Sequence, residues 1–591
     1  MMIARSNLRT TRLMLQSSVA AMALVSGLAA VTCALAEDFD FRLQPGNLLV
    51  SRAVYDNNAN NIAIGTQLPP NCVTGCVAAT ANGSYPNVFN NAIVDGSFGI
   101  TAKIVLDQLL PSGEVVSSLE VPNNSERGIS TTSDQMVSSF SSKSEIALNL
   151  STGGHSVTFM GYFSPIDALD VSNSNTPDVV DPTNPVSETV FRVVADLDEH
   201  GKFHFTKTNA YSGNNGRAAI LNEKQNVVYA SGNAGNGSNP QPNGVIIGAG
   251  AQILTPAHTP LAQQPDPGLP TPLGSFNITQ LGLKADKTGK DTNFRGLTIS
   301  NNVVYTTKGS GGNGINTVYF IDTTGFNAAG KPLACPNGVG VPGANATLPT
   351  APISYNAANL QTLGVTPYNM CVLSGFPTSL AKATTPAPAF PFGVWFADAK
   401  TLYVTDEGNG TATFNPATNT YTAAAAQTTA GLQKWIFDDT AGAWKLAYVL
   451  QAGLNLGVPY TVAKYPTGVN AATGLPFSPA TDGLRNITGR VHRDGTVTIW
   501  SITSTVSGSG DQGADPNKLV KITDKLAATS LPAGESFTTI DAARFGEVLR
   551  GVSFTPGTDV TRFQEADADD RGSCSRGRDG DRHDDDCHGR N

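Results

Sequence analysis

Short runs of alternating apolar and polar residues recur along most of this 591-residue chain. In the clearest copies, an apolar run that opens with Arg or Phe and Gly is followed by a tight polar turn and a second run containing Tyr. These copies start at Phe294 (FRGLTISNNVVYTTKG), Gly216 (GRAAILNEKQNVVYASG) and Pro391 (PFGVWFADAKTLYVTDEG), with looser copies near Ser144, Leu484 and Leu549. Alternation with a period of two residues is typical of β-strands, so each copy predicts a hairpin.

The recurrence itself predicts the architecture. A unit that returns every few tens of residues, and is too small to bury its own apolar face, indicates a modular array. We predict five four-stranded units, which begin at Ser144, Arg217, Arg295, Phe392 and Ile487. The sixth unit is divided: three strands follow Asn47, and the matching inner strand is Leu549–Phe554.

Joining the C-terminal strand to the N-terminal sheet closes the ring without an exposed seam. The prediction is therefore an all-β, six-bladed β-propeller. Seven blades remain possible if strands lie within residues 56–98. A sandwich with Greek-key links is the alternative fold, but it predicts no returning phrase.

The first 36 residues have the parts of a secretory signal peptide. Arg5, Arg9 and Arg12 precede a mostly apolar stretch at 13–31, and Ala34–Ala36 has the small-x-small form of a cleavage site. We expect cleavage after Ala36, a secreted or periplasmic location, and no transmembrane segment in the mature chain. A membrane anchor is the alternative, although the polar residues and many alanines make a weak span.

The C-terminal residues 565–591 alternate Asp with Arg and contain almost nothing apolar. Such a composition predicts a disordered, solvated tail. The propeller domain is therefore expected to occupy residues 37–564.

Charge restricts the class of partner. Charged residues make up only 14% of the chain, and the net charge of −9 argues against binding to nucleic acid or to an anionic membrane. The 60 glycines and 36 prolines suit many short strands and turns rather than amphipathic helices.

Six cysteines remain once the leader is removed, and they fall into three local pairs. Proximity suggests disulfides between Cys72 and Cys76, between Cys335 and Cys371, and between Cys574 and Cys587. A metal or redox site at Cys72–Cys76 is the alternative, but no second Cys or His pair stands at ligand spacing.

Two stretches carry a resemblance to known proteins. NVVYTTKGSGGNGINTVYFIDTTG, from Asn302, and TLYVTDEGNG, from Thr401, resemble the strand and turn phrases of secreted YVTN-type, NHL-type and lactonase-like β-propellers. The resemblance implies the fold. It does not choose an activity, because those groups include enzymes, interaction modules and surface proteins.

The predicted geometry places long loops after the second strand of each blade on the same face as the starts of the inner strands. Loops of this kind on a rigid ring are where binding residues usually lie. Arginines stand near the starts of four inner strands, and Lys143 and Glu145 occupy the analogous place in the second blade; the arginines are Arg217, Arg295, Arg485 and Arg550. Converging guanidinium groups are suited to a carboxylate or phosphate. Alternatively, each arginine packs on its neighbouring blade.

Acids in the same loops suggest a second kind of site. Asp406, Glu407, Asp511 and Asp515 could supply oxygen ligands for Ca²⁺, although acids in glycine-rich loops often only form turns. No cofactor is certain. None of the 7 histidines forms a convincing site, and no Ser stands in a nucleophile-elbow phrase.

The sequence therefore favours an exported propeller whose loop face binds a small anionic or polyol ligand or a partner protein. A Ca²⁺-dependent, lactonase-like or phosphoesterase-like hydrolase is the first alternative. An extracellular structural or surface protein is the second.

Overall fold

The computed structural model describes residues 42–559, apart from 57–66, 69–76, 79–99, 131, 140–145, 185, 187, 236–249, 257–271, 275–292, 310–314, 322–345, 354–369, 380, 382–388 and 471–472. The predicted signal peptide and tail lie outside these residues. So do seven predicted site residues: Cys72, Cys76, Lys143, Glu145, Cys335, Cys574 and Cys587.

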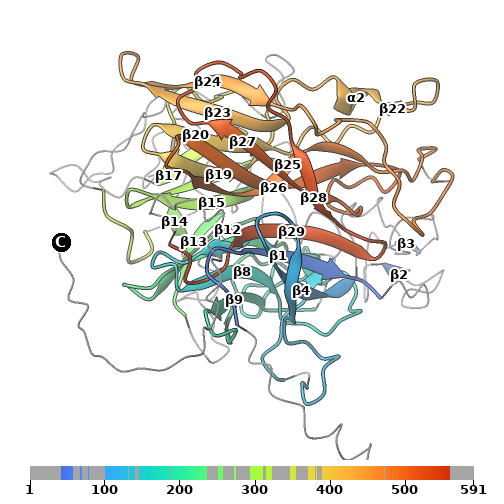
Figure 1. Cartoon of the computed structure of the whole chain (residues 1–591). Helices are drawn as coiled ribbons and strands as arrows, with labels where there is room; N and C mark the ends of the chain where they lie inside the picture. Colours follow the sequence, from blue (N-terminus) through green and yellow to red (C-terminus); the bar gives the residue numbers. More distant parts are fainter. Residues whose placement is uncertain are drawn as a thin grey trace, which may run out of the picture.

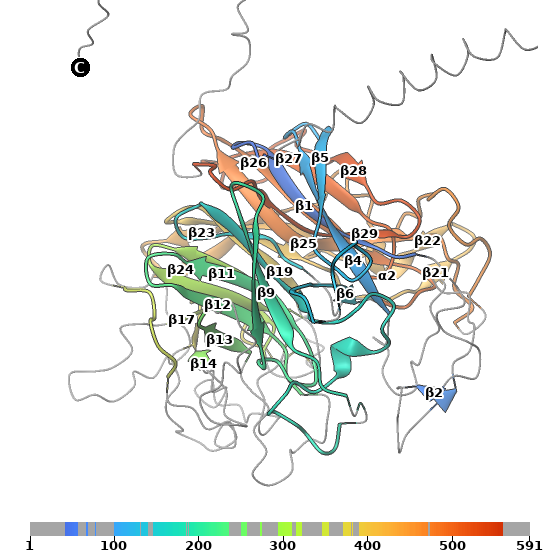
Figure 2. The same ribbon diagram turned by 90° about the horizontal axis from the view of Figure 1, so that it is seen from below.

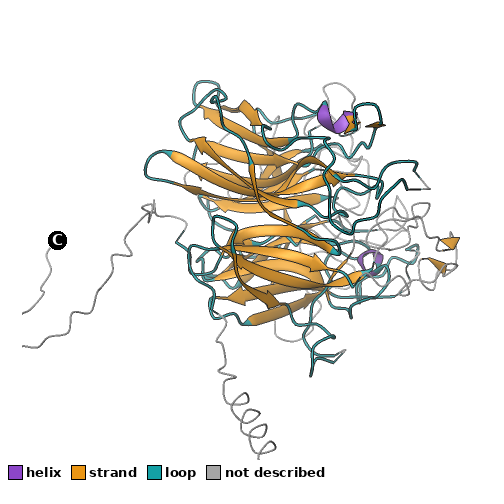
Figure 3. Cartoon of the chain, turned by 45° about the vertical axis from the view of Figure 1, so that its right-hand side comes forward, coloured by secondary structure: helices purple, strands orange, loops and turns teal. Residues whose placement is uncertain are grey.

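Six antiparallel sheets form a ring, because each inner strand contacts the next blade and the last contacts the first. Strands make up nearly all of the regular structure (Figure 3). The chain is a six-bladed β-propeller. Blade 1 consists, from the inside outward, of β29 (Glu547–Phe554), β1 (Leu48–Val54), β4 (Thr101–Leu109) and β5 (Val115–Glu120). Blade 2 consists of β7 (Asn149–Leu150), β8 (Ser156–Tyr162), β9 (Arg192–Asp198) and β10 (Phe203–Thr208). Blade 3 consists of β11 (Gly216–Asn222), β12 (Val227–Gly232), β13 (Ala251–Leu254) and β14 (Pro272–Gly274).

The remaining blades repeat this order. Blade 4 consists of β15 (Phe294–Ser300), β16 (Val303–Lys308), β17 (Thr317–Ile321) and β18 (Met370–Val372). Blade 5 consists of β19 (Pro391–Asp398), β20 (Thr401–Asp406), β23 (Gly431–Asp438) and β24 (Ala443–Leu450). Blade 6 consists of β25 (Ala480–Val491), β26 (Thr496–Val506), β27 (Lys518–Lys525) and β28 (Thr538–Ala542).

Short elements decorate the ring. They are β2 (Gln67–Leu68), β3 (Val77–Ala78), β6 (Ser138–Ser139), β21 (Phe414–Asn415), β22 (Thr420–Tyr421), the 3₁₀ turn at Val171–Asn173 and helix α2 (Thr422–Ala425). Among the described residues, no helix has the length and apolar character needed to cross a membrane.

The ring closes as the sequence predicts. Strand β29 pairs with β1 in an antiparallel register that runs from Leu48 opposite Phe554 to Val54 opposite Glu547, and the two lie side by side in Figure 1. Arg52 of β1 reinforces this join, because its guanidinium lies 2.7 Å from both Asp107 of β4 and Glu547 of β29. Seen from below, blade 1 lies against blade 6 (Figure 2). The two ends of the propeller are therefore held in one sheet.

A repeated hydroxyl group links neighbouring blades. In five blades, a Ser or Thr on the second strand donates a hydrogen bond to a carbonyl of the next blade's inner strand or of the segment leading into it; the donors are Ser51, Thr158, Ser231, Thr307 and Thr405. In blades 3, 4 and 5 the donor stands two residues after the Tyr of the recurring phrase. The phrase therefore encodes a contact between blades as well as a strand.

Two outer strands differ from the sequence prediction. The run FNITQL predicts the fourth strand of blade 3 at Phe276–Leu281, whereas this strand is β14 at Pro272–Gly274. The run NLQTLG predicts the fourth strand of blade 4 at Asn359–Gly364, whereas this strand is β18 at Met370–Val372. Both predicted segments lie outside the described residues. The observed strands are only 3 residues long, too short to show a period.

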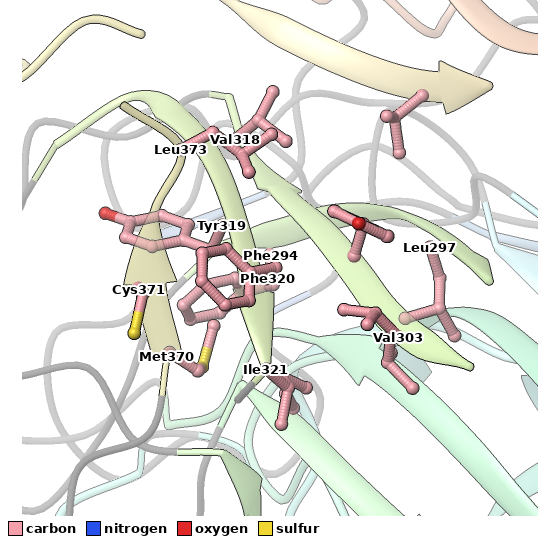
Figure 4. Close-up of a cluster of buried hydrophobic side chains, with 14 of the residues drawn as sticks. Phe294, Leu297, Val303, Val318, Tyr319, Phe320, Ile321, Met370, Cys371 and Leu373 are labelled. Carbon is pink, nitrogen blue, oxygen red and sulfur yellow. The ribbon is translucent and has the colours of Figure 1, made fainter. Parts of the chain in front are cut away.

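The apolar core fills the spaces between blades. Blade 4 contributes Phe294, Tyr319 and Phe320, which gather with Met370 and Cys371 in Figure 4. Contact with blade 5 is aromatic, since the ring centroid of Tyr305 lies 4.6 Å from that of Phe396. Burial of this kind holds the blades rigidly and gives the axial ends of the inner strands fixed positions.

Candidate functional site

The four predicted arginines lie on the inner strands of four different blades. Arg217 is on β11, Arg295 on β15, Arg485 on β25 and Arg550 on β29, and all are at most 5% exposed. Such burial is unusual for arginine, because removing a guanidinium from water is costly unless it is paired.

Two of these arginines flank Glu407, which directly follows β20 of blade 5, and a third is close enough to be affected by its charge. Arg485 Nε donates to Glu407 Oε2 over 3.1 Å, and Arg485 Nη2 lies 3.0 Å from the same oxygen. On the other side, Arg295 Nη2 lies 3.7 Å from Glu407 Oε1. Arg217 is close enough for both Glu407 and Arg485 to affect its pKa. The carboxylate thus lies between arginines of blades 4 and 6, with that of blade 3 nearby.

Blade 5 lacks the arginine that its neighbours carry. Phe392 stands at the corresponding place, before Gly393, as Arg295 stands before Gly296. Its ring centroid is 5.3 Å from Cζ of Arg295 and 5.2 Å from Cζ of Arg485. An aromatic ring between two guanidinium groups holds both by cation–π attraction.

Burial dominates the electrostatics of this cluster. Burial, with a smaller contribution from the positive charge of Arg485, lowers the pKa of Arg217 and of Arg295 to about 10. Glu407 and Asp511 oppose the shift without cancelling it. The arginines therefore stay charged at neutral pH.

The loop that carries Glu407 is fixed by a second acid, which the sequence did not single out. Asp482 accepts hydrogen bonds from Gly410 N at 2.8 Å, Gln512 Nε2 at 2.7 Å and Gln427 Nε2 at 2.6 Å. Gly408 has φ of +82°, and a Cβ there would lie 2.5 Å from Asp482 Oδ2. Glu407 is therefore positioned by a loop that requires glycine.

Glu407 retains one unused acceptor. Its Oε1 is buried and accepts no hydrogen bond among the described residues, and 3.7 Å from Arg295 is too long for one. Buried carboxylate oxygens are normally hydrogen-bonded. This oxygen is suited to a donor from outside the described chain, such as a hydroxyl group.

Arg550 does not join the Glu407 group. It donates from Nη1 to the carbonyl of Gly513 over 2.9 Å and from Nη2 to the hydroxyl of Tyr55 over 3.1 Å. It thereby ties the 507–517 loop to blade 1. Lys143 and Glu145 lie outside the described residues, so their place at the axis stays a prediction.

The four acids suggested as calcium ligands have separate environments. Asp406 accepts from the N–H groups of Phe390 and Gly408, and burial raises its pKa to about 6. Asp511 accepts from Gly513 N at 2.8 Å.

Asp515 accepts from the hydroxyls of Thr505, Ser507, Ser509 and Tyr465, and burial raises its pKa to about 6. Glu407 is the acid between the arginines. Within the described ranges, no three His, Cys, Asp or Glu side chains form a group that could hold a metal ion. The described residues thus give the calcium hypothesis no support.

Of the cysteines in the predicted disulfides, the structure describes one. Cys371 of β18 is fully buried and disulfide-bonded. Its predicted partner, Cys335, lies outside the described residues, so the pairing stays a prediction.

Comparisons with known proteins identify no family for this chain. No protein-family model matches the chain. A search of curated proteins found no match either.

Solved structures resemble the chain only distantly. A protein from Lactobacillus plantarum has 8% identity over 86% of this chain and 99% of its own, with a TM-score of 0.27. The hemagglutinin-neuraminidase ectodomain of parainfluenza virus 5 has 10% identity over 86% and 96%, with a TM-score of 0.31. A carbohydrate-active enzyme of family AA12 from Trichoderma reesei has 11% identity over 78% and 98%, with a TM-score of 0.24. Likeness at this level carries no argument about function.

Proposed function

We propose that this propeller binds a small anionic ligand that also carries hydroxyl groups, at the axial end of its inner strands. Arg217, Arg295 and Arg485 would contact the anionic group, and Glu407 Oε1 would accept a hydrogen bond from a ligand hydroxyl. The observation that carries the proposal is the position of one buried carboxylate between buried arginines of blades 4 and 6, within electrostatic reach of the arginine of blade 3.

The electrostatics support an anion in preference to a neutral ligand. Burial lowers the pKa of Arg217 and Arg295 in spite of the nearby carboxylates. A bound carboxylate or phosphate would add negative charge beside these guanidinium groups, and charge-assisted hydrogen bonds to arginine are the strong ones. The unused oxygen of Glu407 favours a ligand that is a polyol as well as an anion.

Location belongs to the same proposal. The signal-like residues 1–36 suggest export, so the ligand would be met in the periplasm or outside the cell. We also propose that residues 37–564 form the propeller domain and that residues 565–591 form a charged tail.

Gluconate is a suitable first probe because it combines a carboxylate with hydroxyl groups. Titration calorimetry should show binding of gluconate, and weaker binding or none for sorbitol, which lacks the charge. Arg217→Met should weaken gluconate binding by about tenfold or more, the usual value of one charge-assisted hydrogen bond. Arg217 is preferred for this test because it lies at the edge of the Glu407 pairs.

Arg490 offers a matched control. It is a half-buried arginine on β25, its Cζ lies 4.4 Å from the ring centroid of Phe554, and burial lowers its pKa too. Arg490→Met should leave gluconate binding unchanged. If neither gluconate nor inorganic phosphate binds at millimolar concentration, or if both variants bind gluconate equally, the axial arginines serve packing and the proposal fails.

A further inference from the structure

A separate hollow lies at the seam where the ring closes. Its volume is about 240 Å³, and three segments line it: Tyr460–Ala463 before β25, Asn517–Lys518 at the start of β27, and Ala542–Phe545 between β28 and β29. It is lined by blade 6 and by the segment leading into β29, and none of its lining residues belongs to the arginine cluster.

Lys518 is the notable group in this hollow. Its Nζ lies 3.7 Å from the ring centroid of Tyr460, whose hydroxyl is anchored by a 2.8 Å hydrogen bond to the carbonyl of Pro516. The side chain is half-buried, and burial lowers its pKa. Within the described ranges, no carboxylate lies at ion-pair distance from it.

A second lysine of this protein shows what is missing. Lys207 Nζ also lies 3.7 Å from an aromatic centroid, that of Phe163, but it forms an ion pair with Asp134 at 3.3 Å. Lys518 makes the same contact with an aromatic face and has no such acid among the described residues. A partly desolvated ammonium group without a carboxylate is suited to an anion that comes from outside.

The rest of the hollow determines which anion fits. Arg544 adds a second, exposed cation on the wall, and its backbone N–H donates to Glu547. Val462 and Phe545 supply apolar walls that pack on the cluster around Tyr465. The volume is below the roughly 300–1,000 Å³ of pockets for drug-sized ligands, so one small ring or short chain fills it.

We propose that this hollow binds a small apolar monocarboxylate, with the carboxylate at Lys518 and Arg544 and the apolar part between Val462 and Phe545. The site is independent of the axial arginines and of the function proposed for them.

Binding here would also strengthen ring closure. Asn517, on the same wall, donates from Nδ2 to the carbonyls of Thr503 and Leu549, both at 2.9 Å, and its Oδ1 accepts from Leu549 N at 2.8 Å. One side chain thus holds β29 against blade 6. A ligand that binds only the closed ring stabilises it by mass action.

Benzoate is the probe, and benzamide is its uncharged counterpart. Titration calorimetry on the full mature chain should show benzoate binding, with benzamide weaker by about tenfold or more because the charge-assisted contact is lost. Benzoate should also raise the melting temperature.

Variants then locate the binding. Lys518→Met, which keeps the apolar stem, should weaken benzoate by a similar factor. Lys521→Met should not, since Lys521 lies three residues along β27 and on its other face. Arg217→Met should bind benzoate normally, which separates this site from the axial one. Equal binding of benzoate and benzamide, normal benzoate binding by Lys518→Met, or no binding at millimolar concentration would overturn the proposal.

Discussion

Replacing Glu407 by Gln tests whether this carboxylate holds the arginines of neighbouring blades. The change keeps the shape of the side chain and removes the charge that lies 3.0 Å from Arg485 and 3.7 Å from Arg295. Both arginines are then buried without that acid. Removing one partner of a buried ion pair costs about 3–5 kcal/mol, so we expect a loss of free energy of unfolding in this range.

The magnitude can be measured in two ways. Urea denaturation should give the loss directly as a lower midpoint at constant slope. In thermal melting, an unfolding entropy of about 2.1 cal/mol/K per residue over roughly 500 residues gives about 1 °C per kcal/mol, hence a decrease of about 3–5 °C.

The control is Glu120→Gln, which breaks a half-exposed pair with Lys103 at 3.3 Å. Such pairs contribute about 0–1 kcal/mol, so this variant should resemble the parent protein. If Glu407→Gln is no less stable than Glu120→Gln, other groups compensate the arginines, and our reading of the cluster is wrong.

Two further predictions concern the blades and their acids. Thr405→Val removes the hydroxyl that donates to the Arg485 carbonyl and accepts from Gly393 N at 2.7 Å. Urea denaturation should show that the free energy of unfolding falls by about 1–3 kcal/mol. The exposed Thr411→Val should show no such loss. Burial raises the pKa of Asp482 to about 7, so its folded form binds a proton that the unfolded form has released. Stability should therefore fall as pH rises from 5 to 8, and Asp482→Asn should flatten this dependence; a profile that instead rises with pH would contradict the assignment.

Much of the fold could be predicted because its information is local. The hairpin of β15 and β16 is an example: Asn301 and Asn302 both have positive φ, at 49° and 60°, as two-residue hairpin turns require. The inner strand of blade 5 also begins within one residue of its predicted start at Phe392, whereas that of blade 6 begins at Ala480, ahead of the predicted Ile487. The outer strands β14 and β18 were misplaced because strands of 3 residues are too short to show alternation.

The site was only partly predictable. The arginines of blades 3, 4 and 6 could be expected near one another, since the sequence places each near the predicted start of an inner strand. Glu407 was taken as a metal ligand, and the structure places it between Arg295 and Arg485. One signal was available, because Phe392 interrupts the arginine series at blade 5. The geometry of the loop that carries Glu407 could not be predicted, because it depends on Asp482, which is distant in the sequence.

Two features recur from blade to blade: the hydroxyl donors and the inner-strand arginines. Comparing their contacts distinguishes a structural role from a functional one. The hydroxyl donors, among them Thr307 and Thr405, make the same kind of bond to a backbone carbonyl in five blades, as a structural repeat should. The arginines do not all share a partner. Arg295 and Arg485 both lie against Glu407, whereas Arg550 binds the Gly513 carbonyl. A packing role would favour identical contacts in each blade. The different contacts of the arginines therefore favour a binding site over a packing role.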